Sequence, residues 1–498
     1  MRGGLHHVTA ITRDVQANVD FWMGFLGLSL VKQTAGFEDA QQLHLFYGDA
    51  RGRPGTLISF LVWQGGAPGR VGHGQVAEIA LTIPRGRIGD WLTRALDHGI
   101  AVQGPSREFG ASVLRLKDPD GIIVKLVGTD QPDGDWPAAP SGLHAATLWS
   151  DDVFATTAFL AQFGFGITAV EAGVTRLTSP GGALDIRDAS GFVPGIPGTG
   201  VIDHVALRVP DAAQVTTWQA RLPGATTVHD RRYFTSLYVR DPAGVLIELA
   251  SDGPGMAVDE PAEALGHKLV FPPEFAAQSA DLRVSLPQFA RPGEERTIMR
   301  QLPFVHRIHR PDAADGSAMV LLHGTGGNEA DLMPLAHRIA PHATLIGVRG
   351  RSTEEGVARF FRRLSVDSFD QDDIRSEARA FRAFWDGAVS GYDLDPARLT
   401  VLGYSNGANF AGAVMGLYPG LIRQAVLLRP MAVLSQMPKV DLTGTRVLTL
   451  AGAQDPYGRY APALNAWLRN SGADLTARQI NAGHNLSPDD LTTAQQWL

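Results

Sequence analysis

The chain has 498 residues, of which 44% are hydrophobic and 19% are charged. At about 100 to 200 residues per domain this length predicts about three compact units, and the composition is too apolar for a disordered protein. The net charge is −7 and no segment gathers Lys and Arg into a basic face that would neutralise phosphates, which argues against a nucleic-acid partner.

The absence of cysteine limits the chemistry of the chain. Without thiols there is no disulfide, thiolate zinc site, iron–sulfur cluster or cysteine nucleophile, so any metal must be bound by histidine and carboxylate. The N-terminal sequence MRGGLHHVTA lacks a continuous apolar core, and no apolar run approaches the roughly 18 residues of a membrane span. We expect a soluble, cytoplasmic protein without a membrane partner.

The N-terminal half contains an internal repeat. The segment DPDGIIVKLVG from Asp118 recurs as DPAGVLIELAS from Asp241, in each case a tight turn followed by an alternating strand. Four similar strands open the repeats: LHHVTAIT, VAEIALTIP, LHAATLWS and IDHVALRVP. We therefore predict four βαβββ-like units of α+β class, near residues 5–63, 75–128, 142–188 and 200–250. They form one module pair at 1–130 and a second at 140–252.

Three of these strands carry residues suited to bind a metal. His6 and His7 lie on the first strand, where only one of them can point into a shared site, His204 occupies the comparable position in the fourth repeat, and Glu248 lies on the last strand of that repeat. Two imidazoles and one carboxylate form the set typical of non-haem Fe(II), which leaves room for a substrate and dioxygen, whereas a zinc site is more often closed or holds one water. Period-two alternation predicts that His6 and His7 point to opposite faces of their strand. Lys125 stands where the other half has Glu248, so we expect one working site.

Residues 1 to about 290 resemble the vicinal-oxygen-chelate superfamily, and within it the extradiol-type dioxygenases that cleave hydroquinones. The resemblance is carried by GLHHVTAIT, the stretch from Tyr47-Gly48-Asp49 to Pro54-Gly55-Thr56, VIDHVALRVP, RRYFTSLYVRDPAGVLIELASDGPG and LGHKLVFPPEF. It implies that His7, His204 and Glu248 bind Fe(II), with Mn, Zn or Ni as alternatives, and that dioxygen is the co-substrate. It also implies that His6, Arg231 and Tyr238 surround a small aromatic substrate as hydrogen-bonding or proton-transfer groups.

One residue departs from the family pattern. Asp203 stands where these enzymes often have a second histidine beside the ligand of the fourth repeat. The ligand set stays complete, and we expect the change to act on ligand orientation or on substrate choice.

Three alternatives stay open for this half of the chain. A glyoxalase-like Zn or Ni lyase or isomerase usually takes a fourth protein ligand, where this chain has Lys125. A catechol-specific extradiol enzyme would differ in its products, and a metal-free protein that binds aromatic compounds would need no metal at all. Metal identity, oxygen uptake and product spectra distinguish these alternatives.

After Ser251 the pattern changes in kind. Short apolar pieces punctuated by proline and glycine predict a connector at 253–300 that packs on the dioxygenase half. From 301 to 498, continuous apolar strands such as AMVLLHG, RLTVLGYS and RVLTLAG alternate with helical stretches. Strands buried on both faces and separated by helices predict an α/β domain with a mostly parallel sheet.

This C-terminal domain contains the elements of a serine hydrolase. The sequence GYSNG follows a strand and precedes a helix, which is the context of a nucleophile elbow for Ser405. Asp455 follows the strand RVLTLAG, and His484 comes later in NAGHNLSPDD, so the three residues stand in the order expected of a triad. The loop HGTGG closes another strand, and we expect the N–H groups of Thr325 and Asn406 to form the oxyanion hole.

Residues 301–498 resemble the phospholipase/carboxylesterase family of α/β hydrolases in LLHGTGGNEADLMPLA, ARFFRR, GYSNGANFA and AGHNLSPDDL. The resemblance implies a small ester-like substrate. The segment Arg359–Arg363 either places an anionic group of that substrate or forms a solvated charged face. We expect a fusion of an Fe(II)-dependent ring-cleaving dioxygenase with a carboxylesterase-type serine hydrolase, acting in one aromatic-degradation or quinone-detoxification pathway. The sequence predicts no oligomeric state, and consecutive action rests only on co-occurrence in one chain.

Overall fold

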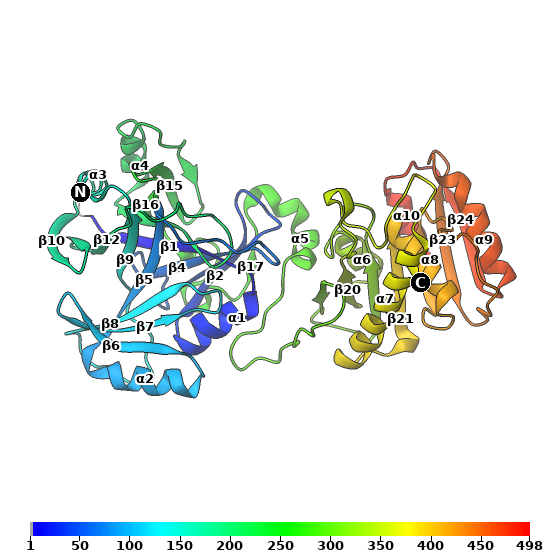
Figure 1. Ribbon diagram of the computed structural model, residues 1–498, viewed down its shortest axis with the longest axis horizontal. Coiled ribbons are helices and arrows are strands. Elements are labelled where there is room, and N and C mark those ends of the chain that lie inside the picture. The colour runs from blue at the N-terminus through cyan, green and yellow to red at the C-terminus, as the bar shows by residue number, and fades with distance from the viewer. Residues whose placement is uncertain (1–2) are drawn as a thin grey trace. The chain divides into compact units, whose positions relative to one another are not determined.

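The computed structural model describes residues 3–498, which divide into two compact units (Figure 1). The first unit takes the chain up to Ala277 together with Phe289–Arg296, and the second takes Gln278–Gln288 and Thr297–Leu498. The segment predicted as a connector is thus shared between the units, and its helix α5 (Ser279–Ser285) packs in the second.

The first unit is built from four modules of similar strands, as the repeats predict. The first two modules contain β1 (Leu5–Thr12), α1 (Val15–Val19), a π-helical turn (Asp20–Phe25), β2 (Ser29–Ala35), β3 (Leu43–Gly48), β4 (Leu57–Val62), β5 (Gln75–Pro84), α2 (Ile88–Asp97), β6 (Val102–Glu108), β7 (Ala111–Lys117) and β8 (Ile123–Thr129). The last two contain β9 (Leu143–Ser150), α3 (Val153–Ala161), β10 (Gly166–Glu171), β11 (Val174–Ser179), β12 (Gly182–Asp188), β13 (Ile202–Val209), α4 (Ala212–Gln219), β14 (His229–Asp230), β15 (Phe234–Arg240) and β16 (Leu246–Pro254). The predicted α+β class is confirmed.

The first module pairs with the fourth, and the second with the third. A nine-stranded sheet has the order β14-β15-β16-β13-β1-β4-β3-β2-β17, and an eight-stranded sheet has the order β10-β11-β12-β9-β5-β8-β7-β6. In the first sheet β1 lies antiparallel to β13 and parallel to β4, and all eight of its residues are buried. In the second sheet β5 pairs with β9 in the same antiparallel way. Each sheet therefore places residues far apart in sequence on neighbouring strands.

Aspartate begins three of the module helices. The side chains of Asp14, Asp152 and Asp211 each accept a hydrogen bond from the N–H three residues later, at 3.0, 2.9 and 2.9 Å. An aspartate N-cap satisfies donors that the first turn of a helix leaves free. Its recurrence at the same place confirms that the modules share local structure as well as sequence.

A buried lysine holds the start of the connector on the first unit. The ammonium of Lys32 on β2 is fully buried and lies 2.5 Å from a carboxylate oxygen of Asp259 and 2.5 Å from one of Glu260. A buried charge must be paired, so these two carboxylates fix residues 259–260 beside β2. The short strand β17 (Leu269–Val270) continues this attachment by pairing with β2.

The second unit is an α/β domain, as predicted. Its strands are β18 (His306–His309), β19 (Ala318–Leu322), β20 (Thr344–Val348), β21 (Leu399–Tyr404), β22 (Gln424–Leu428), β23 (Arg446–Gly452) and β24 (Asp474–Ile480), in the sheet order β18-β20-β19-β21-β22-β23-β24. Its further helices are α6 (Met333–Ile339), α7 (Gln371–Gly391), α8 (Asn406–Leu417), α9 (Ala461–Asn470) and α10 (Pro488–Trp497). The strands pair in parallel except at β18, which is antiparallel to β20.

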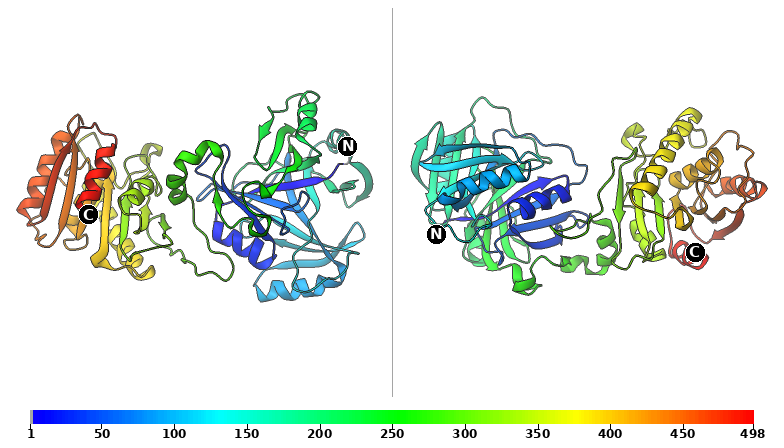
Figure 2. Two further views of the ribbon diagram at one scale, coloured as in Figure 1. Left: turned by 180° about the vertical axis from the view of Figure 1, so that it is seen from behind. Right: turned by 90° about the horizontal axis from the view of Figure 1, so that it is seen from below.

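Helices lie on both faces of this sheet (Figure 2), and an apolar core fills the space on each face. Alternate residues of β19 show the division, because Val320 belongs to the core with α7, α8 and α9, whereas Leu321 belongs to the core with α5, α6 and α10. Strands that bury both faces have the continuous apolar sequence seen here. No helix in residues 3–498 is both long and apolar enough to cross a membrane.

Candidate metal centre and hydrolytic site

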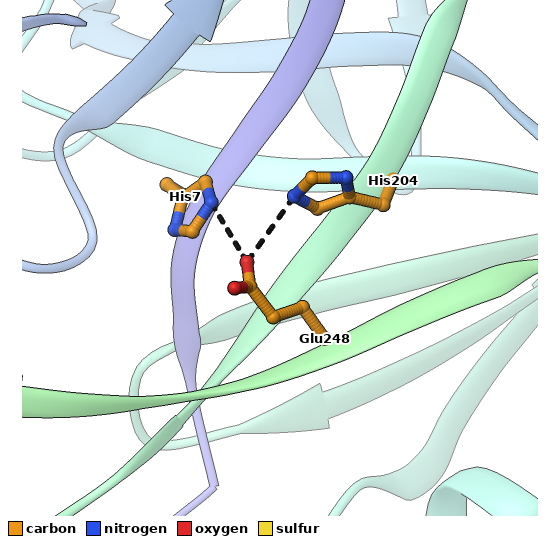
Figure 3. Close-up of side chains that lie close together, drawn as sticks. All are labelled: His7, His204 and Glu248. Carbon is orange, nitrogen blue, oxygen red and sulfur yellow. Dashed lines mark ion pairs between the residues drawn. The ribbon is translucent and has the colours of Figure 1, made fainter. Parts of the chain in front are cut away.

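Three neighbouring strands bring the predicted metal ligands together. His7 comes from β1, His204 from β13 and Glu248 from β16, which are adjacent in the nine-stranded sheet. His7 Nε2 lies 2.9 Å and His204 Nε2 lies 3.1 Å from the same oxygen, Oε2 of Glu248. Figure 3 shows both imidazoles pointing at this carboxylate.

The surroundings of the three residues fit a divalent cation. One ligand atom from each lies within 4.8 Å of the others, and no second group of this kind occurs among residues 3–498. Glu248 is fully buried, and neither of its carboxylate oxygens makes a well-aligned hydrogen bond within the described chain. Buried, converging polar atoms of this kind need a charged partner. Two imidazoles and a carboxylate suit Fe(II), Mn or Zn.

His6 fixes the tautomer of His7. Burial, followed by the nearby ring of His7, lowers the pKa of His6 to about 3, so the His6 ring is neutral near neutral pH. Its Nε2–H donates to the carbonyl of Ser251 at 3.1 Å, which leaves Nδ1 free to accept from His7 Nδ1–H at 2.9 Å. His7 therefore keeps an unprotonated Nε2 for a cation.

The arrangement of His6 differs from the predicted strict alternation. The pairing of β1 with β13 shifts its register between Leu5 and His7, and such a bulge re-aims neighbouring side chains. The rings of His6 and His7 therefore touch instead of pointing to opposite faces. His7 lines the cavity described below, and His6 lies behind it, hydrogen-bonded to Ser251.

Asp203 holds the second imidazole. Its Oδ2 lies 2.7 Å from Nδ1 of His204, so His204 also turns Nε2 toward Glu248. Burial alone would lower the pKa of His204, but the nearby carboxylates of Asp203 and Glu248 outweigh it and raise the pKa to about 9. Burial would raise the pKa of Glu248, but the nearby ring of His7, followed by that of His204, holds it well below its usual value.

A cavity of about 250 Å³ opens beside the three ligands. Its apolar walls come from Phe37, Phe46, Leu61, Phe234 and Leu246, and its polar walls include His44, Arg231 and Tyr238. An apolar cavity of about 150 Å³ already admits benzene, so this one has room for a substituted single ring. Arg231 and Tyr238 thus share one wall of this cavity, with Arg231 Nη2 3.3 Å from the Tyr238 hydroxyl. Burial raises the pKa of Tyr238, which keeps this hydroxyl protonated.

The sequence prediction missed His44. It lies on β3 and lines the cavity together with Phe46. The two residues are separated by one position, so period-two alternation along LHLFYG would have placed both on the same face.

The second sheet carries an ion-pair network in place of a metal site. Lys125, the counterpart of Glu248, lies 2.7 Å from Glu78 on β5 and 2.6 Å from Glu108 on β6. Arg115 also contacts Glu78, at 2.6 Å. The Lys125 ammonium and the Arg115 guanidinium neutralise carboxylates that would otherwise attract a cation.

The second unit contains the predicted nucleophile elbow. Ser405 follows β21 and precedes α8 with φ 49° and ψ −112°, a left-handed backbone that non-glycine residues rarely adopt. The turn needs glycine on both sides, because a Cβ at Gly403 would lie 2.7 Å from the backbone of Ala408 and one at Gly407 would lie 2.0 Å from the Leu322 carbonyl oxygen. The tight turn leaves the Ser405 side chain at the end of the strand.

The triad residues contact one another in order. Ser405 Oγ lies 3.0 Å from His484 Nε2, and His484 Nδ1 lies 2.9 Å from Asp455 Oδ2. The other oxygen of Asp455 accepts the N–H of Tyr457 at 2.8 Å, which fixes the carboxylate. This is the geometry of a nucleophile, a general base and an orienting acid.

One predicted oxyanion-hole donor, Asn406, follows Ser405 directly, and the other belongs to the loop after β19, where a Cβ at Gly324 would lie 3.8 Å from that of Ser405. His323 Nδ1 lies 2.6 Å from the Gly324 carbonyl oxygen and orients the peptide that contains the N–H of Thr325. The amide side chain of Asn406 accepts the N–H of Phe360 at 2.8 Å, so its Oδ1 is occupied in holding the adjacent loop. Within residues 3–498, no hydrogen bond is found from the N–H of Thr325 or Asn406, which leaves both available to an oxyanion.

The arginine-rich segment is engaged within the second unit. Arg359 is buried, and Arg362 contacts Glu354 and lies 3.6 Å from Asp370. The charge of Arg362 is thus balanced by its neighbours, which favours a structural role for that side chain.

Comparison with known proteins finds different relatives for the two units of the chain. Residues 4–126 match the model of the Glyoxalase/Bleomycin resistance protein/Dioxygenase superfamily. MhqO of Bacillus subtilis, named as a ring-cleaving dioxygenase, is 32% identical over 302 residues, covering 57% of this chain and 96% of MhqO. The chlorohydroquinone/hydroquinone 1,2-dioxygenase of Sphingobium indicum is 30% identical over 304 residues, covering 56% and 94%. A crystal structure titled as a Bacillus subtilis dioxygenase is 31% identical and covers 58% and 97%, with a TM-score of 0.55.

The C-terminal part matches a different protein. MhqD of Bacillus subtilis, named as a hydrolase, is 37% identical over 183 residues, covering 36% of this chain and 92% of MhqD. The two folds therefore define an enzyme with a ring-cleaving dioxygenase unit and a hydrolase unit. The chain belongs to the glyoxalase/bleomycin resistance protein/dioxygenase superfamily through its first unit and to the family of MhqD through its second.

Proposed function

We propose that the first unit is an Fe(II)-dependent dioxygenase that opens the ring of a hydroquinone-like substrate, and that the second unit is a serine hydrolase of a small ester, lactone or thioester. The observation that carries the proposal is the convergence of His7, His204 and Glu248 beside a cavity with apolar walls. The relative from Sphingobium indicum, named for hydroquinone cleavage, supports the substrate class.

The residues of the first unit would bind and orient the ring. His7, His204 and Glu248 would hold the metal, which supplies positions at which an aromatic hydroxyl and dioxygen are brought together. The apolar walls bind the ring and exclude water. Arg231, whose side chain is 12% exposed, can balance negative charge that develops on the substrate, and Tyr238 can donate a hydrogen bond through its protonated hydroxyl.

The residues of the second unit would carry out acyl transfer. His484 Nε2 takes the proton from Ser405 Oγ as this oxygen attacks the carbonyl carbon, and Asp455 stabilises the resulting imidazolium. The N–H groups of Thr325 and Asn406 bind the oxyanion. His484 then gives its proton to the leaving group, and water hydrolyses the acyl-enzyme by the same steps.

Two measurements test these activities. The chain is loaded with Fe(II) without oxygen, its bound metal is quantified, and oxygen uptake and product masses are recorded with hydroquinones and with catechol. We expect uptake with hydroquinones, and uptake with catechol alone or tight zinc binding without uptake would refute the first half. Hydrolysis of p-nitrophenyl acetate that is equal in wild type and Ser405→Ala would refute the second half.

We further propose that the two reactions belong to one pathway of aromatic degradation or quinone detoxification, in the cytoplasm. Fusion raises the local concentration of the second site for the first product. If the steps are consecutive, Ser405→Ala should accumulate a product that wild type converts further. Identical end products from the two proteins would remove this link.

A further inference from the structure

A buried arginine lies behind the loop that carries the hydrolase histidine. Arg429 follows β22, is 4% exposed, and has a left-handed φ of 55°. Its own N–H donates to the carbonyl of Leu450 at 2.7 Å, which ties its backbone to β23. This backbone conformation is rare for a residue other than glycine. Because the charged guanidinium is also buried, it needs ionic or hydrogen-bonding partners.

Those partners are the main-chain carbonyls around His484. Arg429 Nε donates to the carbonyl of Gly483 at 2.9 Å, and Nη2 donates to that of Asn485 at 2.9 Å. The carbonyl of His484 itself accepts from the Tyr404 hydroxyl at 3.1 Å. Three consecutive carbonyls of this loop are therefore held by side chains, which restricts rotation of the backbone from which the imidazole projects.

Asp490 sets the direction of the guanidinium. Its two carboxylate oxygens lie 2.7 and 2.9 Å from Nη1 and Nη2 of Arg429, and neither side chain is exposed. One of these oxygens also accepts the N–H of Ser487 at 2.8 Å, in the capping box that begins α10. A two-pronged pair of this kind fixes the plane of the arginine, so the remaining donors are aimed at the loop.

We propose that Arg429, oriented by Asp490, is a positioning residue for His484. It holds the backbone of residues 483–485 so that the imidazole stays between Ser405 Oγ and Asp455. The proposal rests on the proposed hydrolase function. A buried ion pair stabilises a fold little more than apolar side chains of the same size, so stability alone does not account for an arginine at this place.

The test compares kcat and KM for p-nitrophenyl acetate in the full-length wild type and in Arg429→Lys. The lysine ammonium can neutralise Asp490, but it lacks the planar guanidinium whose further N–H groups donate to the two main-chain carbonyls. We expect kcat to fall by about 10- to 100-fold, because small displacements of a reacting group have effects of this size. KM should stay within about twofold, since Arg429 lies behind the triad. A folded variant with wild-type kcat overturns the proposal.

A second variant covers the case in which Arg429→Lys does not fold. Arg429→Met combined with Asp490→Leu replaces the ion pair by apolar side chains, a change that such sites tolerate. We expect this double variant to stay folded at the assay temperature, with an unfolding temperature lowered by the loss of the Ser487–Asp490 capping box, and still to show the lowered kcat. Recovery of wild-type kcat in the double variant overturns the proposal.

Arg351→Met is the matched control. Arg351 binds both oxygens of Glu377, at 2.7 and 2.9 Å, and its other described hydrogen bond runs to the Pro303 carbonyl. Its kcat should stay within about twofold of wild type, and an equal loss of kcat in this control overturns the specific role of Arg429. Ser405→Ala distinguishes failure of the proposed hydrolase function from failure of the positioning role. Esterase activity equal to wild type in Ser405→Ala refutes the hydrolase function itself. Activity that is lost in Ser405→Ala but kept in Arg429→Lys refutes only the positioning role of Arg429.

Discussion

The carboxylate of Asp203 lies 2.7 Å from Nδ1 of His204, the residue that follows it. The same relationship occurs at the other imidazole, where His6 accepts a hydrogen bond from Nδ1 of His7. Each histidine of the candidate metal centre is therefore oriented by the residue that precedes it in sequence, one through a neutral ring and one through a carboxylate.

Removal of the Asp203 carboxylate should weaken metal binding. A partner of this kind fixes the tautomer of a ligand and typically contributes about 10- to 100-fold in metal affinity. We expect Asp203→Leu to lose about 100-fold and Asp203→Asn about tenfold, because asparagine still offers an oxygen acceptor. Competitive titration with a chromogenic chelator measures both. Asp252→Asn, which alters a partly exposed pair with Arg208 in the same unit, is the control, and equal affinities in all four proteins would contradict the prediction.

Loss of Glu248 should abolish the metal centre, whereas loss of its counterpart Lys125 should not. Glu248→Gln removes the anionic ligand, so bound Fe(II) should fall further than in the Asp203 variants, together with oxygen uptake. Lys125→Met should keep its metal but lose about 1 to 3 kcal/mol of stability, because Glu78 remains buried with Arg115 as a cationic partner but without the ammonium. Metal analysis and thermal unfolding check both. Loss of metal in Lys125→Met would show that the second sheet also takes part in binding.

Ser405→Ala should separate the two activities. Ester hydrolysis should fall by about 10⁴-fold or more, because the nucleophile of the triad is gone. Oxygen uptake with a hydroquinone should be unchanged, since His7, His204 and Glu248 all belong to the other compact unit. The measurement is both assays on one preparation. A parallel fall in oxygen uptake would mean that the units depend on each other.

Asp118 should make the first unit less stable as the pH rises. Burial raises the pKa of Asp118 from 3.8 to about 7. Below about pH 4 its carboxyl group is protonated in the folded and the unfolded chain. Between pH 4 and 7 the unfolded chain releases this proton while the folded chain keeps it, so stability falls through this window, by about 4 kcal/mol at most.

Asp118→Asn removes this dependence, because asparagine accepts the N–H of Ile122 in the same place without ionising. The unfolding temperature of the variant relative to wild type should therefore rise by several degrees between pH 5 and pH 8. Asp241→Asn is the comparison from the fourth module, where burial also raises the pKa but hydrogen bonds from the Thr156 hydroxyl, at 2.8 Å, and from backbone N–H groups oppose the shift, so its change with pH should be smaller than that of Asp118→Asn. If the unfolding temperature of Asp118→Asn relative to wild type falls between pH 5 and pH 8, or changes equally in both variants, the account of Asp118 is contradicted.

Much of the candidate chemistry could be predicted from local sequence. The repeat signals showed where strands end, and comparable positions in the repeats indicated His204 and a histidine of the first strand. The choice of His7 over His6, and the set completed by Glu248, came from the resemblance to the dioxygenase family. The elbow around Ser405 followed from glycine spacing, since Gly403 and Gly407 stand where no Cβ fits.

The rest depends on tertiary pairing. The sequence did not reveal that β1 pairs with β13 and β5 with β9, because similar repeats could pair in several ways. The bulge that brings His6 onto His7 is a matter of register between two strands. The contacts of Lys32 with Asp259 and of Arg429 with Asp490 join residues far apart in the chain, and no local pattern marks such partners.

The most direct test of the central claim is the fate of labelled dioxygen. Fe(II)-loaded chain is incubated with hydroquinone under ¹⁸O₂, the product is reduced at once to prevent oxygen exchange with water, and its mass is measured beside that from Glu248→Gln. A ring-cleaving dioxygenase at His7, His204 and Glu248 predicts a ring-opened product with two labelled oxygens from wild type and none from the variant. An unlabelled product, a quinone with its ring intact, or equal labelled product from Glu248→Gln would contradict it.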